Sequence, residues 1–283
     1  MNKLGTAFVA SFLFFTTTQS RLFAQWASAT HALQLPILIT LGNGESGSGF
    51  FIATSNHFFL ATAAHVLFDA STGHLRSDTA ELAWPSADPT NSSTCRMQAN
   101  LAKLQADNNI RINTPHDVAV VRCGLVITNN ATVYRLDEMH VISNAEPVMV
   151  HSSDVRKLKD VNVGDDVYIF GYPSSVGLKQ SPKFDYSKPL LRKGVVSGIY
   201  NQAQTITIDA AVYFGNSGGP VFEAQQLGLG QESYTIIGVT TEIIPFVDVS
   251  KNETYHYSNV NVSNSGYSVV QPVDFILQLL WDN

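Results

Sequence analysis

Hydrophobic positions from residue 35 onward fall in short runs that are either continuous or alternate with polar residues. The runs are rich in Val, Ile, Phe, Thr and Tyr, and turn-forming residues separate them, which is typical of β-strands joined by tight turns. This pattern predicts an all-β protein. The predicted strands are Leu35–Leu41, Gly49–Ala53, Phe58–Ala61, Val118–Val121, Asp166–Phe170, Gly194–Tyr200, Thr205–Ala210, Pro220–Phe222 and Thr235–Thr241.

One segment near the end of the chain has the spacing of a helix. Val273, Ile276, Leu277 and Leu280 would share one face of a helix over Val273–Trp281. We therefore expect a short C-terminal helix.

The polar, uneven stretch 143–163 divides the rest of the chain into two β units, 35–142 and 164–283. Many short strands with regular turns must close or stack to hide their edges. We therefore expect two β-barrels joined by a linker, with the C-terminal helix attached to the second barrel.

The first 24 residues have the pattern of an export signal. Lys3 supplies the positive charge, and Leu4–Phe15 is an uncharged apolar run, shorter than the roughly 20 residues that span a bilayer. Cleavage is expected after Ala24, with Ala29 as the alternative, which leaves residues 25–34 as an N-terminal segment. We expect a secreted or periplasmic protein without a stable membrane anchor.

Composition narrows the classes of function. The hydrophobic fraction of 45% excludes disordered and fibrous proteins, and 17 Lys and Arg against 23 Asp and Glu give a net charge of −6. Because no basic run occurs, the sequence argues against nucleic-acid binding. Cys95 and Cys123 are too few for a disulfide framework, and whether they form one bridge or stay as thiols is left open. The oligomeric state is not determined by the sequence.

The segment Gly215–Pro220 (GNSGGP) carries the most informative chemistry. Its glycines suit a tight turn that exposes the Ser217 hydroxyl and lets a substrate backbone approach closely. The N–H groups of Gly215 and Ser217 could then point at one developing oxyanion. Ser217 is a candidate nucleophile and the two N–H groups a candidate oxyanion hole.

A serine nucleophile requires a base and a group that orients the base. His65 follows the predicted strand Phe58–Ala61 among small residues, and Asp117 stands at the start of the apolar strand Val118–Val121. The chain order His65, Asp117, Ser217 makes a chance occurrence of these residues improbable. We expect these three residues to be catalytic.

With their flanking residues, these motifs resemble those of the chymotrypsin-like (trypsin-fold) serine proteases, in particular the bacterial and HtrA-type branch. The segments that carry the resemblance are Ser46–Ile52, Thr62–His65, His116–Val120, Asp209–Ala211 and Gly215–Pro220. The resemblance implies two six-stranded antiparallel β-barrels with the active site between them. It also implies that Ser217 is the nucleophile, His65 the general base and acid, and Asp117 the orienting carboxylate.

Two features depart from that family. Digestive members carry Asp before the serine to pair with a new N-terminal amine, whereas this chain has Asn216, so activation by such an ion pair is not expected. HtrA proteins continue into a PDZ domain, for which residues 281–283 leave no room. We therefore expect an HtrA-type protease domain without a PDZ domain.

The resemblance also indicates a primary substrate pocket with Ala211 at its base and Val239, Thr240 and Thr241 in its wall. None of these residues is charged, and burying a Lys or Arg without a partner is costly, so small or medium apolar side chains should fit better. Glu242 is the competing feature, because a shift in strand register would turn it inward and favour basic residues.

Taken together, the sequence predicts a serine endopeptidase that cleaves protein or peptide substrates through an acyl-enzyme. It contains no His-Glu-x-x-His motif and no cysteine pair at zinc spacing, so neither a metal nor a cofactor is expected. The alternative is a catalytically silent binding protein on a protease fold.

Overall fold

The computed structural model describes residues 32–86, 93–127, 132–143, 147–174, 180–183, 185–228, 231–254 and 257–281. The expected signal peptide, with its cleavage sites after Ala24 or Ala29, lies outside the described residues. Within these ranges, no helix is both long enough and apolar enough to cross a membrane.

The first unit is a single sheet of ten strands with two short helices, α2 (Ala64–Leu67) and α3 (Leu101–Ala106). Its strands are β1 (Pro36–Leu41), β2 (Ser46–Ala53), β3 (His57–Ala63), β4 (Thr79–Pro85), β5 (Thr94–Asn100), β6 (Ile110–Asn113), β7 (Val118–Ile127), β8 (Thr132–Arg135), β9 (Met139–Val141) and β10 (Met149–His151). The main path runs β6-β7-β3-β2-β1-β4-β5-β9, while β8 pairs with β7 and β10 pairs in parallel with β2.

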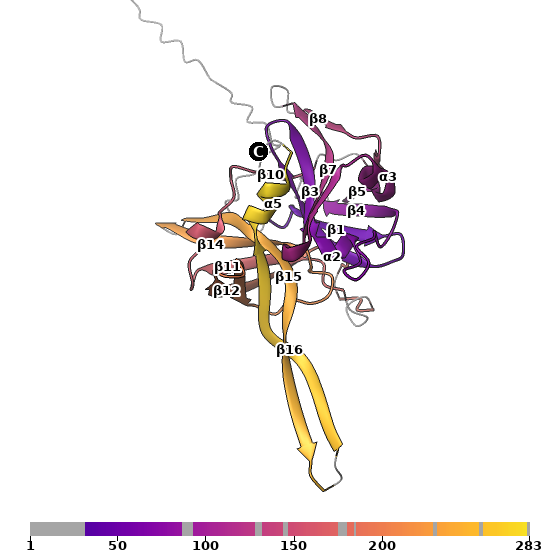
Figure 1. The fold of residues 1–283 in the computed structure, drawn as a ribbon. Coiled ribbons are helices and arrows are strands. Elements are labelled where there is room, and N and C mark those ends of the chain that lie inside the picture. Colours follow the sequence, from indigo (N-terminus) through magenta and orange to yellow (C-terminus); the bar gives the residue numbers. More distant parts are fainter. Residues whose placement is uncertain are drawn as a thin grey trace, which may run out of the picture.

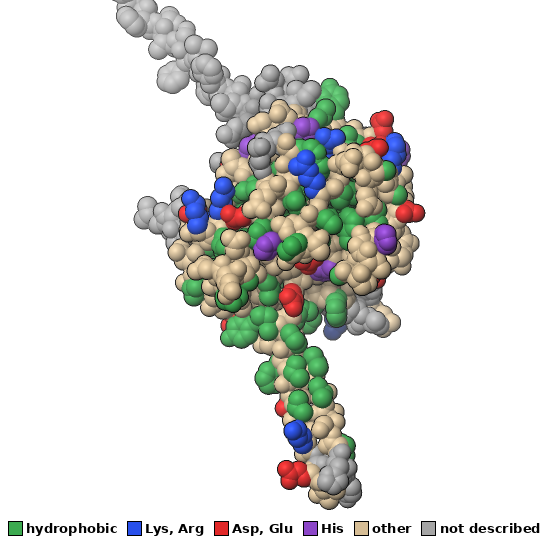
Figure 2. Space-filling model, in the orientation of Figure 1, with side chains coloured by type: hydrophobic (Ala, Val, Ile, Leu, Met, Phe, Trp, Pro, Cys, Tyr) green, Lys and Arg blue, Asp and Glu red, His purple; other side chains and the backbone are tan. Residues whose placement is uncertain are grey.

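The second unit is a closed barrel of six antiparallel strands, in the order β11-β12-β13-β16-β15-β14. Its strands are β11 (Asp166–Gly171), β12 (Leu190–Tyr200), β13 (Thr205–Asp209), β14 (Pro220–Gly228), β15 (Gln231–Asn252) and β16 (Tyr257–Pro272). The outer halves of β15 and β16 leave the barrel as a long hairpin (Figure 1), which carries hydrophobic side chains on its surface (Figure 2).

The expected all-β fold with two β units is therefore confirmed, and the second unit has the expected six strands. The first unit differs from a six-stranded barrel. Among its described strands, β6 pairs only with β7 and β9 only with β5, so the sheet does not close into a ring. Strand β10 also lies inside the segment 143–163 that was predicted to be a linker.

Three neighbouring strands of the first sheet, β2, β3 and β7, are buried on both faces. In β2, Phe51 packs in the core of the first unit, whereas Phe50 and Ile52 pack in a second core that includes Phe170 and Phe222 of the barrel. Successive side chains of a strand point to opposite faces, which explains why these strands appear as continuous apolar runs. The shared core fixes the two units relative to each other.

The C-terminal helix α5 (Val273–Leu279) packs into the shared core through Val273, Phe275 and Ile276. It ends two residues before the predicted boundary at Trp281. The ring of Phe275 stacks on His116, with 3.5 Å between ring centroids. The helix therefore supports the segment that leads into Asp117.

A buried ion pair joins the segment after β10 to the barrel. Arg156 pairs with Glu223 of β14, which has no exposed surface, and the Arg156 N–H donates to the Ile236 carbonyl. The pKa of Glu223 is raised to about 7, mainly by burial and then by a hydrogen bond with Asp165, whereas Arg156 acts to lower it. This carboxyl group therefore titrates close to neutrality.

The two cysteines are free and buried, which answers the question that the sequence left open. Cys95 lies on β5 and Cys123 on β7, and four strands separate β5 from β7 along the sheet path. Burial raises the pKa of the Cys123 thiol to about 12. Both thiols therefore act as small apolar side chains.

Candidate active site

His65 and Asp117 come together because their strands are neighbours. Strand β3 pairs with β7, so that Ala63 lies opposite Val118. His65 follows β3 on helix α2, and Asp117 precedes β7 with a left-handed backbone (φ 49°, ψ 46°). This unusual backbone, rare for a residue other than glycine, turns the carboxylate towards His65.

The Asp117 carboxylate holds His65 through two contacts. Oδ1 accepts from the His65 backbone N–H at 2.8 Å, and Oδ2 lies 2.6 Å from Nδ1 of the ring. The Ala64 N–H also donates to the Asp117 carbonyl, at 2.9 Å. With Nδ1 donating to the carboxylate, Nε2 of the neutral ring is left as the acceptor.

All four carbonyl groups of the turn 214–217 are anchored. The carbonyl of Phe214 accepts from the Ser174 N–H at 2.6 Å, and that of Asn216 accepts from Thr240 Oγ1 at 2.7 Å. Ser48 of β2 holds the other two carbonyls: its hydroxyl donates to Gly215 at 2.6 Å and its N–H donates to Ser217 at 2.8 Å. The turn is therefore fixed from both units.

These anchors determine where the N–H groups of the turn point. In a trans peptide the N–H and C=O point in opposite directions, so the Gly215 N–H points away from Ser174 and the Ser217 N–H points away from Thr240. Among the described residues, neither N–H has a hydrogen-bond partner. Both donors are available for an anionic oxygen.

Gly218 allows the turn to lie against the first sheet. It has a φ of +81°, which favours glycine, and a Cβ at this position would overlap the Thr62 hydroxyl and the Ser48 carbonyl. Only a residue without a side chain fits here. The close contact explains the glycine that directly follows Ser217.

An open cleft of about 690 Å³ lies between the two units. The sequence-predicted residues His65, Gly215, Ser217, Thr240 and Thr241 all line it, and Asp117 contacts His65. The cleft is the place where the structure brings these predicted residues together.

The predicted substrate pocket is arranged differently from the expectation in two places. Val239 is fully buried in the core shared by the two units, and the described residues that line the cleft include Val212 and Phe214 but not Ala211. The register of β15 shifts between Thr240 and Glu242, and Glu242 lines the cleft. The assignment of the pocket residues therefore stays a prediction. Glu242 is the residue that would instead favour basic substrate side chains.

Sequence reasoning did not single out Ser48 or Ser174. Ser48 is fully buried, and its hydroxyl also accepts from the Tyr172 N–H at 3.0 Å. A serine between two glycines in a strand indicates a close approach of another backbone, and this signal is present at Gly47–Gly49. Ser174 acts through its backbone N–H, for which the sequence offers no signal.

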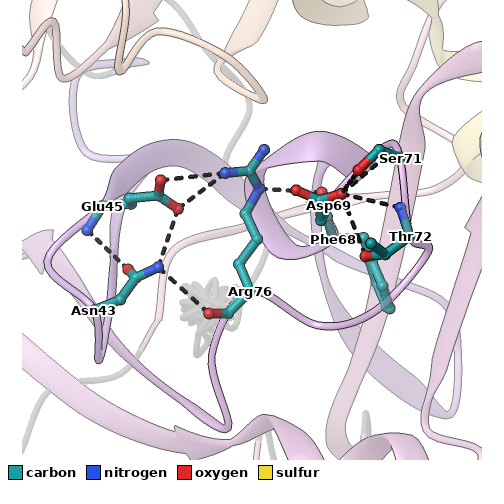
Figure 3. Close-up of polar contacts among 7 residues, drawn as sticks. All are labelled: Asn43, Glu45, Phe68, Asp69, Ser71, Thr72 and Arg76. Atoms are coloured by element: carbon teal, nitrogen blue, oxygen red, sulfur yellow. Dashed lines mark hydrogen bonds and ion pairs between the residues drawn. The ribbon is translucent and has the colours of Figure 1, made fainter.

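A polar network forms the rim of the cleft on the first unit (Figure 3). Arg76 donates to both carboxylate oxygens of Glu45, at 3.2 and 3.0 Å, and to the carbonyl of Phe68 at 3.2 Å. Hydrogen bonds from Arg76 and then Asn43 lower the pKa of Glu45. The network ties the loop after α2, and hence His65, to the β1–β2 turn.

The same loop is stabilised by Asp69, whose carboxylate accepts from the Ser71 hydroxyl and from the N–H groups of Thr72 and Ser71 (Figure 3). These hydrogen bonds, above all the one from the Ser71 hydroxyl, lower the pKa of Asp69 to about 2.

Among the described residues, no three His, Cys, Asp or Glu side chains are grouped as metal ligands. The Ser217 hydroxyl, the His65 imidazole and the backbone of Gly215 line the cleft, and the Asp117 carboxylate contacts His65.

Comparison with known proteins agrees with this geometry. The family described as "Trypsin-like peptidase domain" matches residues 47–229. No curated protein matches the chain. Among solved structures, the chain is similar to the crystal structure of Deg5, at 16% identity over 88% of each chain with a TM-score of 0.49.

It is also similar to the HtrA-type protease AlgW with a tripeptide, at 17% identity and a TM-score of 0.48, over 88% of this chain and 60% of that chain. A third similar structure is the Rv3671c protease in an inactive form, at 15% identity over 89% of each chain with a TM-score of 0.44. The family match covers more than half of the sequence, and we conclude that the chain belongs to the trypsin-like peptidase family.

Proposed function

We propose that this protein is a serine endopeptidase that hydrolyses peptide bonds through an acyl-enzyme, with Ser217, His65 and Asp117 as its catalytic residues. One observation carries the proposal: the His65–Asp117 pair and Ser217 meet at one cleft, where two N–H groups of the serine turn are unpaired among the described residues. This set of groups matches what acyl transfer by serine requires.

In the proposed mechanism, Ser217 Oγ attacks the substrate carbonyl carbon while His65 Nε2 accepts the hydroxyl proton. Asp117 keeps the ring in the correct tautomer and stabilises the imidazolium. The N–H groups of Gly215 and Ser217 bind the oxyanion. His65 then gives the proton to the leaving amine, which departs and leaves an ester on Ser217. Water, activated by His65, hydrolyses this ester and restores the free hydroxyl.

The proposed substrates are proteins or peptides with a small or medium apolar residue before the cleaved bond. Val212, Tyr213 and Ile243 supply apolar surface to the cleft and support this preference, whereas Glu242 opposes it. The apolar run at Leu4–Phe15, with Lys3 before it, supports a secreted or periplasmic location.

A fluorophosphonate probe tests the proposal directly, because it phosphonylates only an activated serine. We expect labelling of the full chain at Ser217, identified by mass spectrometry of the modified peptide. The Ser217→Ala variant should fold and remain unlabelled. If the parent protein is not labelled, a silent binding protein becomes the better explanation. If it is labelled at another serine, Ser217 is not the nucleophile.

A further inference from the structure

The hairpin outside the barrel forms an isolated two-stranded ribbon (Figure 1). It consists of residues 245–252 of β15 and 257–264 of β16, which pair with each other and with no other described strand. An isolated two-stranded hairpin is only marginally stable in water. Because the ribbon pairs with no other described strand, both of its outer edges are open to other molecules, and so are both of its faces.

One face of the ribbon, here called the valine face, carries two cross-strand valine pairs. Val247 lies opposite Val262, with exposed fractions of 52% and 63%. Val249 lies opposite Val260, with exposed fractions of 49% and 57%. The opposite face carries the polar pairs Asp248 with Asn261 and Ser250 with Asn259, and an exposed aromatic ring at each end, Phe246 and Tyr257. The exposed apolar side chains along the hairpin are seen in Figure 2.

The base of the ribbon contacts the wall of the cleft. Asn264 lies two residues beyond Val262 on the same face, and its Nδ2 donates to the Val212 carbonyl at 2.8 Å. Val212 and Phe214 line the cleft, and Phe214 is 80% exposed. The base of the ribbon is therefore attached to the cleft wall by this hydrogen bond.

The free edge of β15 follows the same route. Pairing of β15 with β14 ends at Val239, and beyond Thr241 the strand pairs only with β16 among the described strands. The residues after that point, Glu242 and Ile243, line the cleft, and the strand then enters the ribbon. A chain lying in the cleft along β15 would be directed towards the ribbon.

The size of the valine face favours a single extended chain over a second copy of the protein. Eight-residue strands extend about 26 Å and each takes up about 5 Å of width, so one face of the two-stranded ribbon, about 10 Å wide, covers on the order of 250 Å². A stable protein–protein interface needs roughly 800 Å² on each partner. An extended polypeptide, only one strand wide, fits the smaller area.

We propose that the valine face is an exosite for unfolded protein substrates, which lie along it as an extended strand while the cleft cuts the same chain. Alternate apolar side chains of the substrate would pack on the valines, because every second side chain of an extended strand points to the same side. This inference rests on the proposed peptidase function and adds a binding site outside the cleft, for chains that are longer than the cleft can hold and carry apolar or β-branched segments.

The test compares a long and a short substrate. β-Casein serves as the unfolded protein, and an internally quenched octapeptide copied from a cleaved site of β-casein serves as the substrate confined to the cleft. The variant is Val247→Thr with Val262→Thr, which keeps the branched shape that strands favour. Ser250→Thr with Asn259→Thr, a polar pair on the opposite face, is the matched control.

We expect the ratio of kcat/KM for β-casein to kcat/KM for the octapeptide to fall about tenfold in the valine variant and to stay unchanged in the control. An unchanged ratio in the valine variant overturns the exosite. Size-exclusion chromatography with light scattering is run on each protein. If the valine substitutions convert an oligomer into a monomer, the face binds a second copy and the proposal is wrong.

A binding measurement separates this proposal from the proposed function. Fluorescence anisotropy of labelled β-casein with the full-length Ser217→Ala protein reports binding without cleavage. The valine substitutions should weaken this binding about tenfold, and equal binding overturns the exosite. If neither substrate is cut by the parent protein, the peptidase proposal fails while the anisotropy result still decides the exosite.

Discussion

Replacing Ser48 by alanine should destabilise the protein and slow its reaction with substrate, although Ser48 does not line the cleft. The Ser48 hydroxyl is buried and makes two contacts, one to the Gly215 carbonyl at 2.6 Å and one from the Tyr172 N–H at 3.0 Å. The substitution removes both contacts and leaves two buried backbone groups without a partner.

The magnitude follows from those two groups. Leaving a buried polar group unsatisfied costs about 1–3 kcal/mol, so we expect the free energy of unfolding to fall by roughly 3 kcal/mol, with a ceiling of about 6 kcal/mol. The freed Gly215 carbonyl also loosens the turn that carries the oxyanion donors. Complete loss of one such donor lowers kcat by about 10²–10³. Because Phe214 and Asn216 stay anchored, a decrease of about 10–100-fold is expected.

Urea unfolding monitored by fluorescence gives the stability, and the rate of fluorophosphonate labelling gives the reactivity of Ser217. Ser268→Ala is the matched control, because the Ser268 hydroxyl is also fully buried and donates to the Ala210 carbonyl at 2.8 Å, not to the turn 214–217. It should lose about 1–3 kcal/mol of stability with little change in labelling rate. If Ser48→Ala matches the parent within about 0.5 kcal/mol and about twofold in rate, the anchoring argument is wrong.

Three further predictions concern other parts of the molecule. Asp117→Asn should lower kcat by about 10⁴ near neutral pH, the size of effect typical of trypsin-type triads, because an amide favours the wrong His65 tautomer; steady-state kinetics with a peptide substrate checks this, and a variant with near-normal kcat contradicts the assigned role. The raised pKa of Glu223, about 7 against 4.5 when unfolded, contributes stability that is fully present below about pH 4.5 and is lost as the pH rises through about 7. At about 1.4 kcal/mol per pKa unit this amounts to about 3 kcal/mol, so Glu223→Gln should remove that loss between pH 5 and 8 in urea titrations, and an unchanged pH dependence would exclude Glu223 as its source. Profiling with a peptide library should show small or medium apolar residues before the cleaved bond, whereas dominant Arg or Lys would assign the pocket to Glu242.

The fold class and the order of the motifs were determined by local sequence pattern. Apolar runs such as Phe58–Ala61 and Val118–Val121 predicted strands that the structure contains, because strands buried on both faces must be continuously apolar. Motifs around His65, Asp117 and Ser217 pointed to residues that the fold then gathers at one cleft or in direct contact. The preference of such residues for a turn or a strand depends on only a few neighbouring positions, so the sequence alone was enough to predict these elements.

Only the tertiary structure decided the rest. Strand β16 escaped prediction because its outer half is rich in Asn and Ser, which have low strand propensity, and its pairing with β15 overrides that preference. The extra strands β4, β5 and β9 of the first sheet also depend on partners far away in the chain. Ser48 and the Gly215 carbonyl are separated by 167 positions, yet their hydrogen bond fixes the serine turn. Such contacts depend on how the two units pack: the glycines beside Ser48 indicate that another backbone comes close, but only the tertiary structure shows which one.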